Sequence, residues 1–323
     1  MDKTHFFNLI NAANINSGLL SENFARSHED FLNFPVNLKG LPILIAADSA
    51  VFEFSSKDVF QISEDEILTK IYNLGNREYV GYQHAFHSNK FLRRFRVKKI
   101  FKKIVDKITL QNQTVFDEVA RIKQKYKIVG AFQTRNIPHF GHEKIIEHML
   151  EVCDHVVINP VIGPKKSGDV KLEVLEMVYE YLIAHKYKHR ISFLPIFANM
   201  FYAGPNEALH HAILRQRVGF NVFSVGRDHA GAQGAYLPSL AVTKLVESEK
   251  NLNIKIFGHK GAVFCDTCNS AVLFGECDHD VKQYKDIAGT HFRLSIKNQE
   301  IFSFADKDMQ SYLKSLNLEV FEE

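Results

Sequence analysis

The 323-residue sequence predicts an α/β fold in which a parallel sheet gathers polar residues along one edge. From about residue 126, short β-branched apolar runs alternate with longer stretches of helical spacing, as in strands joined by crossover helices. Each polar motif described below follows the end of an apolar run. Because ligands of open α/β sheets bind outside the carboxyl ends of the strands, we expect a functional site there.

The elements of this sheet follow from the spacing of apolar residues. Strands are predicted over residues 128–132, 155–162, 191–197 and 221–225, and helices over residues 143–151, 171–185 and 207–217. Residues 1–110 contain short apolar runs among turn residues and predict a smaller, largely β domain. The expected division is therefore an N-terminal domain over residues 1–110, a central domain over 111–240 and a C-terminal subdomain over 241–323.

Residues 91–108 read FLRRFRVKKIFKKIVDKI and predict an amphipathic helix with a basic face. A helix of this kind lies on a membrane or a nucleic acid in some proteins, and it also serves as a linker whose lysines face water. The linker is favoured, because the net charge of the whole chain is only +3.

Composition narrows the class of protein. With 46% hydrophobic and 24% charged residues the chain is ordinary for a globular protein, and no apolar run approaches the length of a membrane span. The first residues lack a basic segment, an apolar stretch and a small-residue cleavage site. We therefore expect a cytoplasmic protein with neither a nucleic acid nor a membrane as partner.

The most informative segment is QTRNIPHFGH, residues 133–142, between a predicted strand and a predicted helix. The start of a helix exposes free backbone N–H groups and the positive end of a dipole, so it attracts anions. Arg135 adds a planar fork for a tetrahedral oxyanion, and His139 and His142 are spaced to face one ligand. The residue types predict a phosphate-handling site.

Three further motifs follow other predicted strands. Residues 159–169 form a Gly- and Pro-containing loop with Lys165 and Lys166, and residues 200–212 contain a Gly-Pro break before a helix. Residues 226–231 read GRDHAG, where small residues permit close approach of the backbone and Arg227 offers a second anion contact. The alternatives are a plain loop, a helix start and an Arg–Asp surface pair, respectively.

Three of the four cysteines cluster near the C-terminal end. Cys265 and Cys268 form a CxxC pair, and Cys277 is followed closely by His279. This spacing predicts a structural zinc site with Cys265, Cys268, Cys277 and His279 as ligands, with His259 as the alternative fourth ligand.

At these residues the chain resembles the ATP sulfurylase (sulfate adenylyltransferase) family. The family's QTRNPxHxxH, GxTKxGD, MxYAGPREA and GRDHAG motifs occur here, in that order, as QTRNIPHFGH, NPVIGPKKSGD, MFYAGPNEA and GRDHAG. The CxxC region and AGTHFR, residues 288–293, resemble a zinc knuckle and an SGTKVR element of bacterial and archaeal members. The resemblance implies a Rossmann-like nucleotidyltransferase domain, with a PUA-like domain before it.

The resemblance also implies a reaction in which sulfate and ATP give adenosine 5′-phosphosulfate and pyrophosphate, with Mg²⁺ accompanying ATP. It assigns Thr134, Arg135 and Asn136 to catalysis, and Gln133, Arg135 and Ala230 to sulfate. It assigns ATP to Gln133, Thr134, Arg135, Asn136, His139, His142, Gly226, Arg227, Asp228, His229 and Val263. A homo-oligomer is a further expectation taken from the family.

The sequence departs from the family pattern at several positions. Phe201 and Asn206 stand where arginines are usual, and Lys165 occupies the threonine position of the loop. The pattern HxGH at residues 139–142 also occurs in other nucleotidyltransferases. Two alternatives therefore stay open: an HxGH-type enzyme with a different acceptor, and a non-catalytic nucleotide-binding relative.

Overall fold

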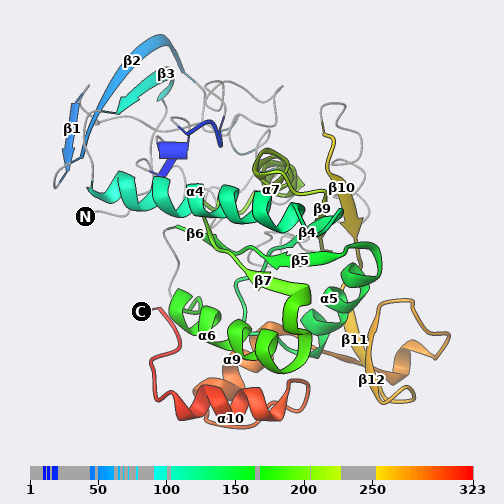
Figure 1. Ribbon diagram of the computed structural model, residues 1–323. Coiled ribbons are helices and arrows are strands. Elements are labelled where there is room, and N and C mark those ends of the chain that lie inside the picture. The colour runs from blue at the N-terminus through cyan, green and yellow to red at the C-terminus, as the bar shows by residue number, and fades with distance from the viewer. Residues whose placement is uncertain are drawn as a thin grey trace.

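A computed structural model gives the structure of the protein (Figure 1). It describes residues 10–11, 13–14, 17–20, 44–47, 50–61, 65, 68, 72, 78, 91–99, 103–163, 168–203, 205–226 and 252–322.

Within these residues the chain forms strands and helices in the following order. They are β1 (Leu44–Ala47), β2 (Ala50–Gln61), β3 (Phe91–Lys99), α4 (Lys103–Lys123), β4 (Val129–Phe132), α5 (Phe140–Val152), β5 (His155–Ile158), β6 (Val161–Ile162), α6 (Leu172–Leu182), the π-helical turn η2 (Ile183–Tyr187), the 3-10 turn η3 (Lys188–Arg190), β7 (Ile191–Phe193), β8 (Ile196–Phe197), α7 (Pro205–Val218), β9 (Val222–Val225), β10 (Lys255–Gly258), β11 (Ala262–Cys265), β12 (Ser270–Leu273), η4 (Val281–Gln283), β13 (Tyr284–Asp286), α9 (Gly289–Lys297) and α10 (Lys307–Ser315). The predicted α/β alternation after residue 126 is confirmed.

The central element of the described chain is a five-stranded parallel sheet with the order β10-β9-β4-β5-β7. Counted along the chain, the strands run 3-2-1-4-5, which is the doubly wound order of dinucleotide-binding folds. The direction of winding reverses between β4 and β9. Ligands bind outside the carboxyl ends of the strands at this switch point, which is where the QTRN turn and Gly226 begin.

Side chains on both faces of the central sheet are apolar and buried. In β4, Val129 and Ala131 enter the core that α4 and α7 cover, whereas Phe132 enters the core that α5 and α6 cover. In β9, Phe223 and Val222 divide in the same way. Because successive side chains of a strand point to opposite faces, short β-branched strands can hold two helical layers.

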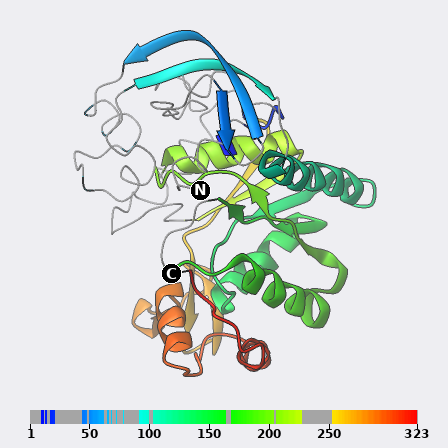
Figure 2. The same cartoon turned by 90° about the vertical axis from the view of Figure 1, so that its left-hand side faces the viewer.

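Two smaller parts flank the central layers (Figure 2). A three-stranded antiparallel sheet of order β1-β2-β3 lies beyond α4, and the C-terminal segment, with a three-stranded sheet of order β12-β11-β13 and helices α9 and α10, lies on the opposite side. The predicted β character of the N-terminal region agrees with its described strands, and its likeness to a PUA domain stays a prediction. Strand β10 lies beyond residue 240 and is part of the central sheet.

One sequence prediction is wrong. Residues 91–99 form strand β3, paired antiparallel with β2, and helix α4 begins only at Lys103. The apolar residues at 91, 95 and 97 fit a period of two as well as helical spacing, and pairing with β2 decides between the two periods. A basic amphipathic helix over residues 91–108, whether a linker or a membrane helix, is therefore excluded. None of the described helices is both long and apolar enough to cross a bilayer.

Candidate functional site

The turn between β4 and α5 is organised by two histidines. His139 is the N-cap of α5, and its Nδ1 accepts a hydrogen bond from the N–H of Gly141 at 3.1 Å. His142 Nδ1 accepts from the N–H of His139 at 3.4 Å, which completes a capping box built from imidazoles. With both Nδ1 atoms accepting, the proton of each neutral ring lies on Nε2 and is available to donate.

The two rings lie 3.9 Å apart between centroids, and a third histidine approaches them. His259 follows β10 and lies beside Gly226, where an added Cβ would come within 3.1 Å of the ring. Burial lowers the pKa of His139 and of His259 to about 4. Burial, with the nearby charges of His139 and His259, holds the pKa of His142 well below its ordinary value. All three rings are therefore neutral at pH 7.

His139, His142 and Gly226, predicted from separate motifs, thus lie together at the switch point. Strand β11 closes the same region, because an added Cβ at Gly141 would lie 3.5 Å from the Cβ of Ala262. Val263, the next residue, lies within β11 and pairs with Val272 and Asp286. Four predicted ATP contacts are therefore neighbours or belong to neighbouring elements.

Arg135 lines a small cavity of about 30 Å³ at the end of β4, whose lining mixes polar side chains such as Gln133 and Asp169 with apolar ones. Its guanidinium lies over the ring of Tyr202 at 5.2 Å, and Nη1 lies 3.9 Å from Oδ2 of Asp169. Nη1 is buried and has no hydrogen-bond acceptor among the described residues, and the buried acceptors Oε1 of Gln133 and Oδ1 of Asp169 have no donor among them. Unsatisfied buried polar atoms are rare, so their concentration at one cavity points to a polar ligand.

Tyr202 has a left-handed backbone conformation. Its φ is +55°, and burial raises the pKa of its hydroxyl to about 12. The buried carboxylate of Glu207 accepts hydrogen bonds from the N–H groups of Phe201 and Ala203, at 3.0 and 3.2 Å, on either side of Tyr202. Glu207 therefore stabilises a conformation that a tyrosine rarely adopts. The ring of Phe201 is buried in the core beneath α7 rather than at the cavity.

Thr134 and Asn136 complete the turn. Thr134 Oγ1 accepts from the N–H of Asn136 at 3.1 Å, and Oδ1 of Asn136 accepts from Nη2 of Arg293 at 2.7 Å. Sequence reasoning missed Arg293 as a site residue, because 157 positions separate it from Asn136. The only available signal was the AGTHFR segment, which carried no assigned role.

Several predicted residues lie outside the described part of the chain. They are Lys165, Lys166, Arg227, Asp228, His229 and Ala230. The expectation that Arg227 and Arg135 face one cavity, and the predicted sulfate contact at Ala230, therefore stay predictions.

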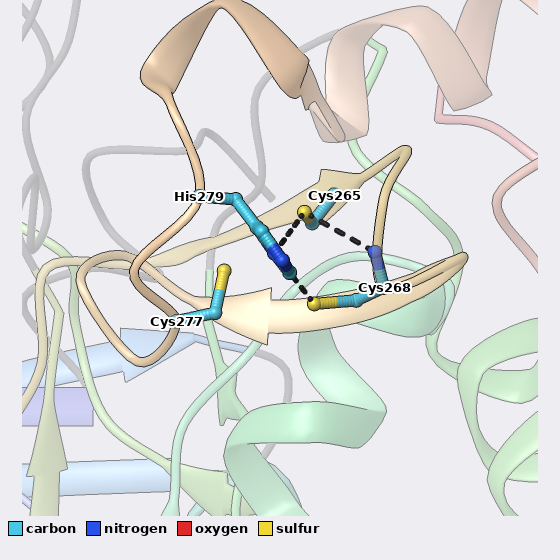
Figure 3. Close-up of side chains that lie close together, drawn as sticks. All are labelled: Cys265, Cys268, Cys277 and His279. Carbon is cyan, nitrogen blue, oxygen red and sulfur yellow. Dashed lines mark hydrogen bonds between the residues drawn. The ribbon is translucent and has the colours of Figure 1, made fainter.

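The three C-terminal cysteines and His279 converge (Figure 3). Their donor atoms all lie within 4.8 Å of one another, with His279 Nδ1 at 3.4 Å from Cys265 Sγ and 3.2 Å from Cys268 Sγ. Three thiolates and one imidazole at such spacing can hold a metal ion, and a tetrahedral site of this composition suits zinc. His259, the alternative fourth ligand, lies at Gly226 instead.

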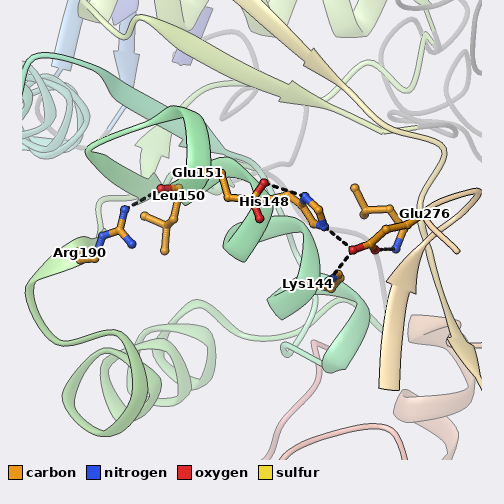
Figure 4. Close-up of polar contacts among 7 residues, drawn as sticks. Lys144, His148, Leu150, Glu151, Arg190 and Glu276 are labelled. Atoms are coloured by element: carbon orange, nitrogen blue, oxygen red, sulfur yellow. Dashed lines mark hydrogen bonds and ion pairs between the residues drawn. The ribbon is translucent and has the colours of Figure 1, made fainter. Parts of the chain in front are cut away.

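The loop that carries Cys277 is fastened to α5 (Figure 4). Glu276 accepts from Lys144 Nζ at 2.8 Å, from His148 Nε2 at 3.0 Å and from the N–H of Leu273 at 2.6 Å. We call these contacts of Glu276 with α5 the Glu276 clasp. Since α5 begins at the histidine pair, the clasp connects the cysteine–histidine cluster to the helix that carries the candidate site.

The five-stranded parallel sheet, with a helix start and polar turns at its switch point, defines a doubly wound α/β protein. Residues 106–303 match the ATP-sulfurylase family, and the chain belongs to that family. A sulfate adenylyltransferase from Pyrococcus abyssi is 32% identical over 260 residues, which cover 80% of this chain and 68% of that protein. A sulfate adenylyltransferase from Staphylothermus marinus is 40% identical over 176 residues, which cover 54% of this chain and 46% of that protein.

The chain thus spans between about half and two thirds of the length of these relatives. Among solved structures, its fold resembles that of a hexameric APS kinase from Thiobacillus denitrificans, with a TM-score of 0.53 and 11% identity. The match covers 83% of this chain and 47% of that one, and at this identity it concerns the fold alone.

Proposed function

We propose that the chain is a sulfate adenylyltransferase, which joins sulfate to the AMP moiety of ATP and releases pyrophosphate. The observation that carries the proposal is the cavity at the end of β4, where a buried Nη1 of Arg135 lacks an acceptor beside the histidine-capped start of α5. A guanidinium fork and a helix start suit two anions that react with each other. Family membership supports the same substrates.

In this proposal a sulfate oxygen attacks the α-phosphorus of ATP. The new bond joins that oxygen to phosphorus, while the bond from the α-phosphorus to the bridging oxygen breaks and pyrophosphate leaves in line. Sulfate is a weak nucleophile and both reactants are anions, so catalysis depends on positioning and on charge neutralisation. No protein nucleophile is required.

The residue roles are proposed from the matching motifs and their placement. Gln133, Arg135 and the backbone of Ala230 would bind sulfate, and Thr134, Arg135 and Asn136 would act in catalysis. The Nε2–H groups of His139 and His142 would donate to ATP phosphates, together with Gly226, Arg227, Asp228 and His229, and Val263 would lie beside adenine. Mg²⁺ would arrive on the phosphates of ATP and reduce their charge.

Zinc would have a structural role at Cys265, Cys268, Cys277 and His279. Bound there, it would hold β11 and the Cys277 loop together, and the Glu276 clasp would transmit that order to α5. We place the boundary between the central and C-terminal parts after Gly258, because β10 pairs with β9. A cytoplasmic homo-oligomer with no nucleic acid or membrane partner completes the proposal.

The test is pyrophosphate release from ATP with the purified full-length chain and a panel of acceptors. We expect release with sulfate, and little release with phosphorylated small molecules or with no acceptor. Release with another acceptor alone would favour a different HxGH-type nucleotidyltransferase. Calorimetric binding of ATP without turnover on any acceptor would favour a non-catalytic relative.

A further inference from the structure

Arg293 joins two loops of the candidate site from a distant segment of the chain. Its Nη2 donates to Oδ1 of Asn136 at 2.7 Å, and its Nη1 lies 3.5 Å from the carbonyl oxygen of Gly168. Asn136 belongs to the turn after β4, and Gly168 precedes Asp169 of the Arg135 cavity. One guanidinium therefore links the turn after β4 to the segment that carries Asp169.

The position of Arg293 is fixed by the packing of α9. Its neighbour Phe292 is 1% exposed and stacks on Phe302 at 4.9 Å between ring centroids. At the start of the helix, an added Cβ at Gly289 would lie 3.3 Å from Nδ2 of Asn136. The helix thus approaches the turn closely, and the amide of Asn136 is held between the guanidinium and the backbone of Gly289.

The charges at this place do not balance. Arg135 and Arg293 are close enough for the charge of Arg135 to lower the pKa of Arg293, although burial is the larger cause. The carboxylate beside Arg135 within the described part of the site is that of Asp169, at 3.9 Å. Two guanidinium groups with one carboxylate leave an excess positive charge in a partly buried site, which an oxyanion would neutralise.

Unused hydrogen-bond donors point the same way. Nε of Arg293 and Nη1 of Arg135 are both buried and lack an acceptor among the described residues. A buried donor without a partner is unfavourable, and a tetrahedral oxyanion offers several acceptors at once. Arg135 precedes Asn136 in the turn and Arg293 donates to Asn136, so the two unpartnered donors belong to side chains on either side of one residue.

We propose that Arg293 is a second arginine of the sulfate subsite and the positioning residue for Asn136. This inference rests on the function proposed above and adds a residue of the C-terminal segment to the machinery of the central sheet.

The proposal is tested with Arg293→Lys and Arg293→Gln, and with Lys297→Gln as the matched control. Lys297 lies on the same helix, one turn onward, with Nζ over the ring of Phe321. The measurements are kcat, the KM for sulfate, the KM for ATP and the melting temperature.

We expect the KM for sulfate to rise at least about tenfold in Arg293→Gln and less in Arg293→Lys, which keeps the charge but loses the fork. The kcat should fall in both variants, because both release Asn136. The KM for ATP should change less than about threefold, and Lys297→Gln should match the unmodified chain.

A second variant, Gly289→Ala, displaces the Asn136 amide without removing a charge. It should lower kcat and leave the KM for sulfate nearly unchanged. The inference is overturned if Arg293→Gln keeps both constants, or if the melting temperature and the two KM values shift together, as a merely structural residue would cause. If the unmodified chain shows no sulfate-dependent turnover, the proposed function itself fails, and this inference fails with it.

Discussion

The cysteine–histidine cluster and the Arg135 cavity are built in opposite ways. The four side chains of the cluster come from residues 265–279, and short strands and turns bring them together locally. The cavity takes Arg135 from one turn and Asp169 and Tyr202 from two later loops, and Arg293 reaches the same turn from the C-terminal segment. A local site can be recognised from spacing alone, whereas a composite site needs the topology of the sheet to bring its parts together.

This difference predicts how each region fails when a residue is changed. Loss of a cluster ligand should remove metal and local order. Loss of Arg135 should remove activity and leave the fold, because its side chain is 30% exposed and belongs to neither apolar core.

The largest effect is expected for Arg135→Ala. Removal of the guanidinium takes away a cation and a hydrogen-bond donor at the proposed reaction centre, so turnover should fall about a thousandfold. The melting temperature should change little, because the side chain is 30% exposed and its ion pair with Asp169 is long.

The control for this variant is Arg190→Ala. Nη2 of Arg190 donates to the carbonyl oxygen of Leu150, near the end of α5, away from the cavity (Figure 4). Turnover should be unchanged in this variant. An active Arg135→Ala protein would remove Arg135 from the proposed chemistry.

The second prediction concerns Cys265→Ser. Stoichiometric zinc, measured by elemental analysis, should be lost, and hydrogen exchange should accelerate over residues 262–286. Asp266→Asn is the matched control, since Asp266 lies within the same knuckle, pairs with Lys285 and is not a ligand. Purified protein that is free of metal and retains slow exchange over these residues would contradict the structural role.

The third prediction compares two buried histidines. The folded pKa values of His139 and His155 are about 4, below the ordinary value of 6.5, so the unfolded chain binds more protons between these values. The contribution of each neutral histidine to the free energy of unfolding should therefore be complete above about pH 6.5. It should be lost as the pH drops toward 4, which lowers the free energy of unfolding by up to about 3 kcal/mol for each histidine.

The addition of ATP should distinguish the two histidines. Bound phosphate would favour a protonated His139, so ATP should reduce the acid-induced loss of stability in the unmodified chain and in His155→Gln. It should have a smaller effect in His139→Gln, as measured by chemical denaturation across this pH range. Equal effects of ATP in the two variants would show that His139 does not contact the phosphates of ATP.

The smallest effect is expected for Glu276→Gln. Glu276 is partly exposed, and exposed ion pairs contribute at most about 1 kcal/mol. The melting temperature should fall slightly, while zinc stays bound and the KM for ATP rises modestly, because α5 loses its ion pairs with the loop that carries Cys277. Loss of zinc in this variant would show that the clasp is part of the metal site.

Much of the fold could be predicted because apolar periodicity is a local property. The strands and helices after residue 126 follow it, and so does the grouping of His139, His142 and Gly226 at strand ends. The error at residues 91–99 arose because their spacing fits two periods, and only pairing with β2 distinguishes them. No strand was predicted over residues 255–258, which complete the central sheet as β10.

The composite part of the site was harder to predict. Asp169 and Tyr202 belong to two motifs that were predicted at strand ends, but their contacts with Arg135 depend on the folded loops. Arg293 reaches the turn through α9, and its segment had no assigned role. Glu207 supports Tyr202 through backbone hydrogen bonds that only the folded chain reveals. A single motif identified the turn, but the tertiary structure identified its partners.

A crystal structure of the full chain with adenosine 5′-phosphosulfate bound would test the central claim most directly. We expect the sulfate group at the carboxyl end of β4, with its oxygens within about 3.2 Å of guanidinium nitrogens of Arg135 and Arg293. Adenosine 5′-phosphosulfate bound elsewhere, or bound with its sulfate group turned away from both arginines, would contradict it.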